Sequence, residues 1–93
     1  MDRYLIEVPH EADVVTCARV VRTFLDTGSH YLTHADWGCK DGDHRAWMIV
    51  EASDHEEARW IVPAPMRSIA KVVKLTKFDS EEIDDILSSH GEE

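Results

Sequence analysis

The sequence predicts a single small α+β domain whose elements follow the order β-α-β-β-α-β. The first observation is its length, because 93 residues correspond to one domain. The second is periodicity: short segments alternate apolar and polar residues, as strands do, while two longer ones repeat apolar residues every three or four positions, as helices do. The third is the position of residues that end helices and strands, since proline, glycine and an Asp-Gly pair fall between these segments.

The first strand and the first helix are clearly marked. Residues 3–8 (RYLIEV) alternate and are followed by Pro9, which predicts a strand that ends there. Residues 11–27 carry one amphipathic stripe, and Gly28 stands where a helix commonly ends. Cys17 lies on this stripe, so we expect it to be a core cysteine.

Residues 30–37 (HYLTHADW) admit two interpretations. A helix would place His30 and His34 at positions i and i+4, a spacing that binds metals. The segment is short, however, and aromatic and β-branched residues at alternate positions favour a strand, which is what we expect. The sequence KDGD at 40–43 then predicts a two-residue Asp-Gly hairpin turn.

The second half of the chain repeats the pattern. Residues 45–52 (RAWMIVEA) predict the returning strand, and residues 53–62 predict a helix that begins with a capping box and stops at Pro63. Residues 70–78 (AKVVKLTKF) predict the last strand. Another capping box opens residues 79–93, where we expect a short acidic helix and tail.

This order is the split βαβ, or ferredoxin-like, arrangement with a four-stranded antiparallel sheet. Both connecting helices then cover the same face of the sheet. We expect the other face to carry Leu5, Leu32, Trp47 and Ile49, which are too apolar to stay in water. We therefore expect a homodimer that covers this face.

The opening RYLIEV, the closing VPAPMRSIAKVVKLTKF and the element order make residues 3–78 similar to small proteins of the dimeric α/β-barrel superfamily. The resemblance implies that residues 1–78 form a domain whose sheet faces a second sheet around a shared barrel. Members of that superfamily include small monooxygenases, haem-degrading enzymes and muconolactone-isomerase-like proteins. The resemblance therefore implies a place for a site, inside the barrel, without fixing a reaction.

The net charge of −9 is concentrated in residues 79–93, which contain seven acids and no Lys or Arg, while residues 1–78 carry only −2. No basic stripe is present to neutralise phosphates, which argues against nucleic-acid binding. No apolar run approaches the ~20 residues needed to span a bilayer. The start MDRYLIEV has no apolar stretch of signal-peptide length, so we expect a soluble cytoplasmic protein with reduced cysteines.

Seven side chains that bind metals occur within fifteen residues: His30, His34, Asp36, Cys39, Asp41, Asp43 and His44. Imidazole, thiolate and carboxylate groups bind zinc, nickel or iron. A tight Asp-Gly turn would place Cys39 opposite His44, with Cβ atoms ~5 Å apart. His34 and Asp36 would lie on the opposite strand face unless a bulge near Gly38 reverses the parity. We expect a transition-metal site with four ligands: His34, Asp36, Cys39 and His44.

Glu7 and Glu51 form a second candidate site. If the first and third strands lie side by side and parallel, both glutamates come near the same end of the barrel interior. Two carboxylates in one cavity raise one pKa, which gives a general acid or base. His34 is a further candidate for proton transfer, and Trp47 would line the cavity and contact a ligand.

Three functions follow from these patterns. The first is a homodimeric barrel that binds a transition metal. The second is a cofactor-independent isomerase or monooxygenase-like enzyme that acts on a small molecule in the barrel. The third is a regulatory or structural dimerisation module.

Overall fold

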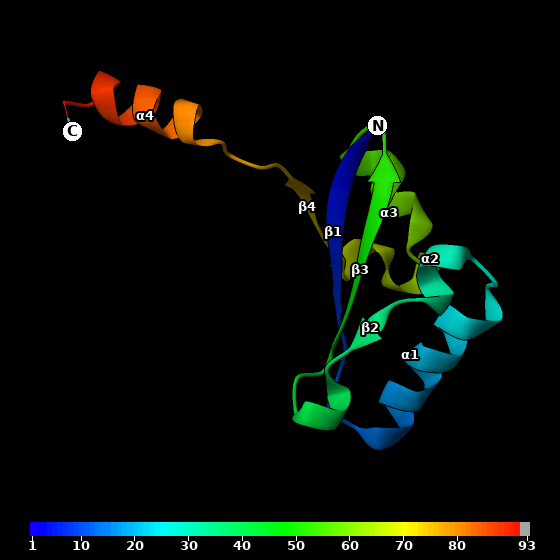
Figure 1. Cartoon of the computed structure of the whole chain (residues 1–93). Coiled ribbons are helices and arrows are strands. Elements are labelled where there is room, and N and C mark those ends of the chain that lie inside the picture. The colour runs from blue at the N-terminus through cyan, green and yellow to red at the C-terminus, as the bar shows by residue number, and fades with distance from the viewer. Residues whose placement is uncertain (92–93) are drawn as a thin grey trace.

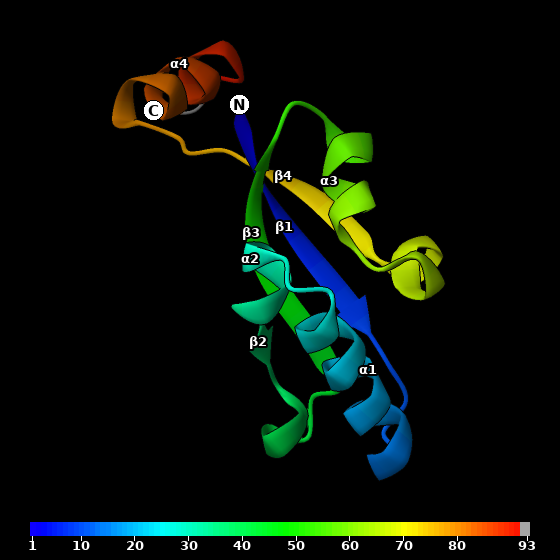
Figure 2. The same ribbon diagram turned by 90° about the vertical axis from the view of Figure 1, so that its right-hand side faces the viewer.

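The computed structural model describes residues 1–91 as one open sheet with helices packed on one of its faces and a C-terminal helix that stands away from it (Figures 1 and 2). All neighbouring strands are antiparallel, in the order β2-β3-β1-β4. The strands are β1 (Asp2–Pro9), β2 (Asp36–Trp37), β3 (Arg45–Ala52) and β4 (Lys71–Leu75). The helices are α1 (Val14–Asp26), α2 (His30–Thr33), α3 (His55–Ile61) and α4 (Ser80–Ser89), with 3₁₀ turns η1 (Cys39–Asp41) and η2 (Ala64–Ile69). The predicted α+β class and four-stranded antiparallel sheet are confirmed, and the strand order is compatible with a ferredoxin-like fold.

The core lies between the sheet and the helices α1, α2 and α3, which Figure 2 shows in front of the strands. Alternate residues of β1 and β3 point into it, because successive side chains of a strand point to opposite faces. Phe24 of α1 and Val62 after α3 are fully buried against them. The buried residues of the two central strands are Tyr4, Ile6, Val8, Ala46, Met48, Val50 and Ala52.

Aspartates begin three of the helices. The carboxylate of Asp13 accepts a hydrogen bond from the backbone N–H of Thr16 at 2.9 Å, and Asp54 and Asp79 do the same for the third residue of α3 and α4. Such a cap satisfies an N–H group that has no partner inside the helix. The helix starts predicted after residues 53 and 79 are confirmed.

The two central strands run in opposite directions, so the expected parallel pair is wrong. Glu7 pairs with Trp47, and Glu51 pairs with Arg3 at the other end of the sheet. The reason is the connection. The chain returns through α1 so that β2 runs parallel to β1, and the hairpin from β2 then reverses the direction of the chain for β3.

Residues 30–33 form one helical turn, so the expected strand over 30–37 is wrong except at Asp36 and Trp37. The turn buries Leu32, which is 2% exposed and lies in the core rather than on the open sheet face. The hydroxyl of Thr33 donates to the backbone carbonyls of Ser29 and His30, which holds this turn closed.

The connection from β2 to β3 is longer than the predicted two-residue turn. Its register is nevertheless the predicted one, because Asp36 pairs with Trp47 and Trp37 with Ala46. Residues 39–41 form the 3₁₀ turn η1, and Gly42 follows with a φ of 86°, a conformation that favours glycine. A bulge near Gly38, which the four predicted ligands would need in order to share one face, is absent from this part of the described chain. Instead the N–H of Gly38 continues the ladder by donating to the carbonyl of Arg45 at 3.1 Å.

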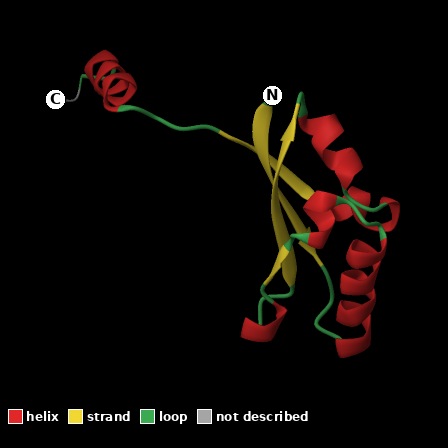
Figure 3. Cartoon of the chain, turned by 45° about the vertical axis from the view of Figure 1, so that its right-hand side comes forward, coloured by secondary structure: helices red, strands yellow, loops and turns green. Residues whose placement is uncertain are grey.

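The sheet face opposite the helices is uncovered, and α4 extends away from the end of β4 (Figures 1 and 3). Closure of the sheet into a dimeric barrel stays a prediction, as does the division into a domain of residues 1–78 and a tail. Glu92 and Glu93, the last acids of that tail, lie outside the described residues. In the part of the chain that the structure describes, every helix is too short or too polar to cross a membrane.

Candidate metal site

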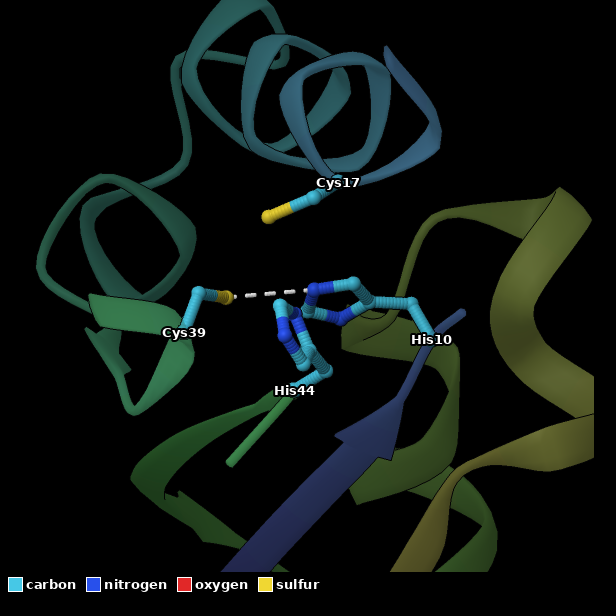
Figure 4. A group of neighbouring side chains, drawn as sticks. All are labelled: His10, Cys17, Cys39 and His44. Carbon is cyan, nitrogen blue, oxygen red and sulfur yellow. Dashed lines mark hydrogen bonds between the residues drawn. The ribbon is translucent and has the colours of Figure 1, made fainter. Parts of the chain in front are cut away.

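Four side chains converge at one end of the sheet, on the face that the helices cover (Figure 4). They are His10, Cys17, Cys39 and His44, and one nitrogen or sulfur atom from each lies within 4.8 Å of those from the other three. Nε2 of His10 lies 3.2 Å from Sγ of Cys39. All four side chains are half-buried. Four donor atoms this close in space form a candidate metal site.

The antiparallel pairing of the central strands brings the two histidines together. Pro9 pairs with Arg45, and the ladder continues one step as the backbone N–H of His10 donates to the carbonyl of His44 at 3.0 Å. His10 therefore has the same parity as Ile6 and Val8, and His44 the same parity as Ala46. Both imidazoles consequently point to the covered face, with ring centroids 5.7 Å apart.

The loop between β2 and β3 brings Cys39 to the histidines. Extension of the observed register places Cys39 directly opposite His44, as the sequence predicted. Gly38, just before it, accepts hydrogen bonds on its carbonyl from the N–H groups of Asp41 and Asp43 at 2.9 and 3.0 Å. On the far side of the loop, Arg45 donates to both carboxylate oxygens of Asp43, at 2.6 and 3.0 Å. These contacts hold both ends of the loop segment that carries two of the four ligands.

Cys17 reaches the site from the first turn of α1, where its N–H donates to the carbonyl of Asp13 at 2.9 Å. Figure 4 shows its sulfur on the underside of α1, in the space above Cys39 and His10. Val20 and Phe24, one and two turns further along, are the buried residues of the same helix. The expectation that Cys17 is a core cysteine is therefore incomplete: it lies at the end of the buried stripe, where that stripe meets the histidines.

Burial of these groups changes their pKa values in a consistent way. The pKa of His10 is lowered by burial and by the neighbouring His44, against an opposing contribution from the backbone of Val8. The pKa of the Cys39 thiol is raised by burial, by the adjacent Cys17 and by the charge of Asp43. Without a cation, His10 is held neutral and Cys39 is held as a thiol. A bound divalent ion reverses the second effect, because it deprotonates a coordinating thiol.

Two nitrogens at the site lack partners among residues 1–91. The Nδ1 atoms of His10 and His44 are buried and make no hydrogen bond in this part of the chain. A buried polar atom without a partner costs about 1–3 kcal/mol. The nitrogen of His10 that faces Cys39 is Nε2, so an ion bound there would leave its Nδ1 without a partner.

A cavity of about 490 Å³ adjoins the two thiols. It is lined by Cys17, Val21, Ala35, Asp36, Trp37, Cys39 and Lys40. Trp37 also packs edge-on against Phe24 and His10, with ring centroids 4.9 and 5.8 Å apart. The cavity therefore gives access to the sulfur side of the site, while the ring of Trp37 packs on His10.

The structure brings together two of the four predicted ligands, Cys39 and His44. His34 lies at the end of α2, where its ring stacks on His30 at 4.4 Å and its Nδ1 lies 2.9 Å from the His30 carbonyl oxygen. Asp36 is exposed on the opposite strand face from Cys39, as the predicted parity without a bulge implied. His34 and Asp36 are outside the cluster of converging donors.

Glu7 and Glu51 do not share a cavity, because the antiparallel pairing puts them at opposite ends of the sheet. Glu7 accepts hydrogen bonds from Trp47 Nε1 at 3.0 Å and from Arg45 at 3.3 Å on the open face. Its carboxylate is therefore paired with a cation, and Trp47 packs with it instead of lining the cavity beside the cysteines.

His10 and Cys17 are the site residues that sequence reasoning missed. The signal for His10 was present: antiparallel pairing of residues 3–8 with 45–52 places it one step beyond the strand, next to His44. The signal for Cys17 was weaker, because its position depends on how α1 is rotated over the sheet. No protein-family model, no curated protein and no solved structure matches this chain.

Proposed function

We propose that this protein binds one transition-metal ion, preferably zinc, through His10, Cys17, Cys39 and His44. The observation that supports the proposal most strongly is the convergence of four donor atoms within 4.8 Å of one another from three separate parts of the chain. In a tetrahedral site with Zn–S of ~2.3 Å and Zn–N of ~2.0–2.1 Å, donor atoms lie ~3.3–3.8 Å apart. Closing the observed group around an ion therefore needs movements of about 1 Å, which side-chain rotations supply.

The chemistry of the donors favours zinc over magnesium, calcium and manganese. Two thiolates and two imidazoles are a common donor set of structural zinc sites, whereas magnesium and calcium require oxygen ligands. Two carboxylates are adjacent in sequence to the proposed ligands, Glu11 beside His10 and Asp43 beside His44; neither belongs to the cluster, and Asp43 is engaged with Arg45. Softer sulfur ligands also disfavour manganese.

The proposed role of the ion is structural. It would connect the end of β1, the first turn of α1 and the loop before β3, which are otherwise joined by few polar contacts. A chain of 93 residues has a thin core. An ion that binds only the folded state adds about 2.7 kcal/mol of stability at a concentration of 100 Kd. The cavity beside Cys17 and Cys39 provides a route by which the ion can reach the site.

Elemental analysis of the untagged protein tests the proposal. We expect about one zinc ion per chain in the wild-type protein and none in a Cys39→Ser/His44→Ala variant. The matched control is His34→Ala/Asp36→Ala, which removes one histidine and one further predicted ligand outside the cluster and should keep the full zinc content. Zinc retained by the first variant, or lost from the second, contradicts the proposed ligand set.

The same cavity favours a second candidate, a small-molecule enzyme of the isomerase or monooxygenase type. In that case the cavity, rather than the ion, would define the function. A compound that shifts the NMR signals of Val21 and Ala35 equally in zinc-loaded and zinc-free protein would support this alternative. A cavity that accepts no compound, in a protein whose zinc content matches the proposal, would contradict it.

A further inference from the structure

The cavity beside the candidate metal site reaches its sulfur ligands and not its histidines. The wall of the cavity includes Cys17 and Cys39 but neither His10 nor His44. Both cysteines are free and half-buried, and Figure 4 draws their sulfur atoms in the space between α1 and the loop that carries Cys39. A small molecule that enters the cavity therefore has access to the two side chains of the site that can be oxidised.

The two thiols are close enough to react with each other. Their Sγ atoms lie within 4.8 Å, whereas the sulfur atoms of a disulfide are ~2.05 Å apart, so the bond needs an approach of at most about 2.7 Å. Rotation of each side chain about its Cα–Cβ bond moves the sulfur, and the two cysteines share this approach. The sequence contains no other cysteine, so a disulfide within one chain has a single possible pairing.

The size and charge of the cavity suit a small neutral oxidant. Its volume of about 490 Å³ is large beside the ~30 Å³ that a water molecule occupies in the liquid, and hydrogen peroxide is only slightly larger than water. The charged residues of the wall are Asp36 and Lys40, whose opposite signs leave it without a net charge. A peroxide therefore meets neither a steric nor an electrostatic barrier on its way to the sulfur atoms.

We propose that the metal site is a redox switch: a peroxide oxidises Cys17 and Cys39 to a disulfide, and the zinc ion is released. This inference rests on the proposed zinc site and adds its regulation. The ion loses both sulfur ligands at once and keeps only two imidazoles, which is half of its donor set. The disulfide then joins the first turn of α1 to the β2–β3 loop, as the ion does in the reduced form, so these two parts stay connected when the ion leaves.

The reaction balances with hydrogen peroxide as the oxidant. The thiolate sulfur of one cysteine attacks a peroxide oxygen, the O–O bond breaks, and the departing hydroxide takes a proton from solvent and leaves as water. The second thiolate attacks the sulfenic acid that results. The S–S bond forms, the S–O bond breaks, and a second hydroxide is protonated to water. Two thiolates lose two electrons and the peroxide gains them, while zinc, which has no redox chemistry, stays divalent.

Treatment of the zinc-loaded, full-length protein with hydrogen peroxide tests the proposal, with zinc release followed by a chromogenic chelator. We expect one zinc ion to be released for each Cys17–Cys39 disulfide that forms, and dithiothreitol to restore both thiols and the uptake of zinc. Trypsin, which cleaves after Lys and Arg, separates residues 4–19 with Cys17 from residues 23–40 with Cys39. Mass spectrometry therefore identifies the disulfide as a cross-link between these two peptides of one chain.

The control is zinc-loaded Cys17→Ser, whose release is measured against the same variant without peroxide. With one thiolate missing, oxidation cannot proceed to a disulfide within the chain. The peroxide-dependent release should therefore be slower than in the wild-type protein, and equal rates would overturn the switch.

The remaining outcomes separate the switch from the zinc site itself. A wild-type protein that contains no zinc before peroxide is added contradicts the proposed function, and the switch with it. In a protein that does contain zinc, four results would overturn the switch alone: no reaction of the thiols, zinc retained after the cross-link forms, zinc lost without the cross-link, or a disulfide between two copies instead of within one.

Discussion

Replacement of Gly38 by alanine is a sharp test of how the β2–β3 loop holds the ligands. A Cβ atom at Gly38 would lie 2.6 Å from the carbonyl oxygen of Asp43 and 2.8 and 2.9 Å from two ring carbons of Trp47. Neither neighbour is free to move. The Asp43 carbonyl accepts from the N–H of Arg45 at 2.9 Å, and the Trp47 ring is held by its hydrogen bond to Glu7.

The expected cost follows from this geometry. Forcing an extra methyl group into a closely packed position costs about 1–3 kcal/mol. Relief requires either the loop of residues 38–44 or the Trp47 ring to shift, and a loop shift moves Cys39 relative to His10. If half of the cost, about 0.5–1.5 kcal/mol, appears in metal binding, the Kd for zinc rises by about two- to twelvefold, since 1.4 kcal/mol corresponds to a factor of ten.

Urea unfolding of the metal-free protein and zinc titration against a competing chelator measure the two effects. The control is Gly28→Ala, where φ is +72° but a Cβ would meet nothing within 4 Å. That change should cost ~1–2 kcal/mol of stability, as a left-handed residue does, without altering the Kd for zinc. A Gly38→Ala protein with wild-type stability and wild-type zinc affinity would refute the reasoning.

Three further predictions concern other parts of the structure. Burial lowers the pKa of His10 below its usual 6.5, so as the pH falls the unfolded state binds a proton before the folded state does. In urea unfolding at a series of pH values, the stability of the metal-free protein should therefore fall as the pH drops below about 6.5, and it should fall less in His10→Gln. Leu32→Ala should lower the free energy of unfolding by about 2–5 kcal/mol if α2 points this residue into the core, whereas a loss below 1 kcal/mol in the same assay would contradict its placement. Glu7→Gln should lower stability by about 0.5–1.5 kcal/mol through its contacts with Arg45 and Trp47 and leave zinc content unchanged; a loss of zinc would show that this pair supports the ligands.

Local patterns in the sequence predicted the helices and strands that are long enough to show a repeat of apolar residues. Strict alternation located β1 and β3, and the capping aspartates before α3 and α4 located those helix starts. The four residues of α2 are too few to show a helical repeat, and the choice there is made by the burial of Leu32, a tertiary contact. The relative direction of the two central strands likewise depends on the connections between them. The alternation of apolar and polar residues within a strand carries no information about that direction.

The candidate site was predictable to the extent that it depends on neighbouring residues. Cys39 and His44 face each other across one loop, and the hairpin signal was sufficient to pair them. His10 and Cys17 join them only through long-range geometry: the antiparallel ladder for the first and the rotation of α1 for the second. His34 and Asp36 were predicted as ligands because they lie close to Cys39 in the sequence. The helical turn α2 keeps His34 away from the cluster, and the alternation of β2 places Asp36 on the opposite face of the sheet.

The coordination shell of bound zinc, measured by X-ray absorption at the zinc edge, tests the central proposal most directly. The predicted result is two sulfur neighbours at ~2.3 Å and two nitrogen neighbours at ~2.0–2.1 Å. Cys17→Ser should replace one sulfur by a lighter neighbour, which assigns that ligand to α1. A shell made only of nitrogen and oxygen in the wild-type protein would contradict the account.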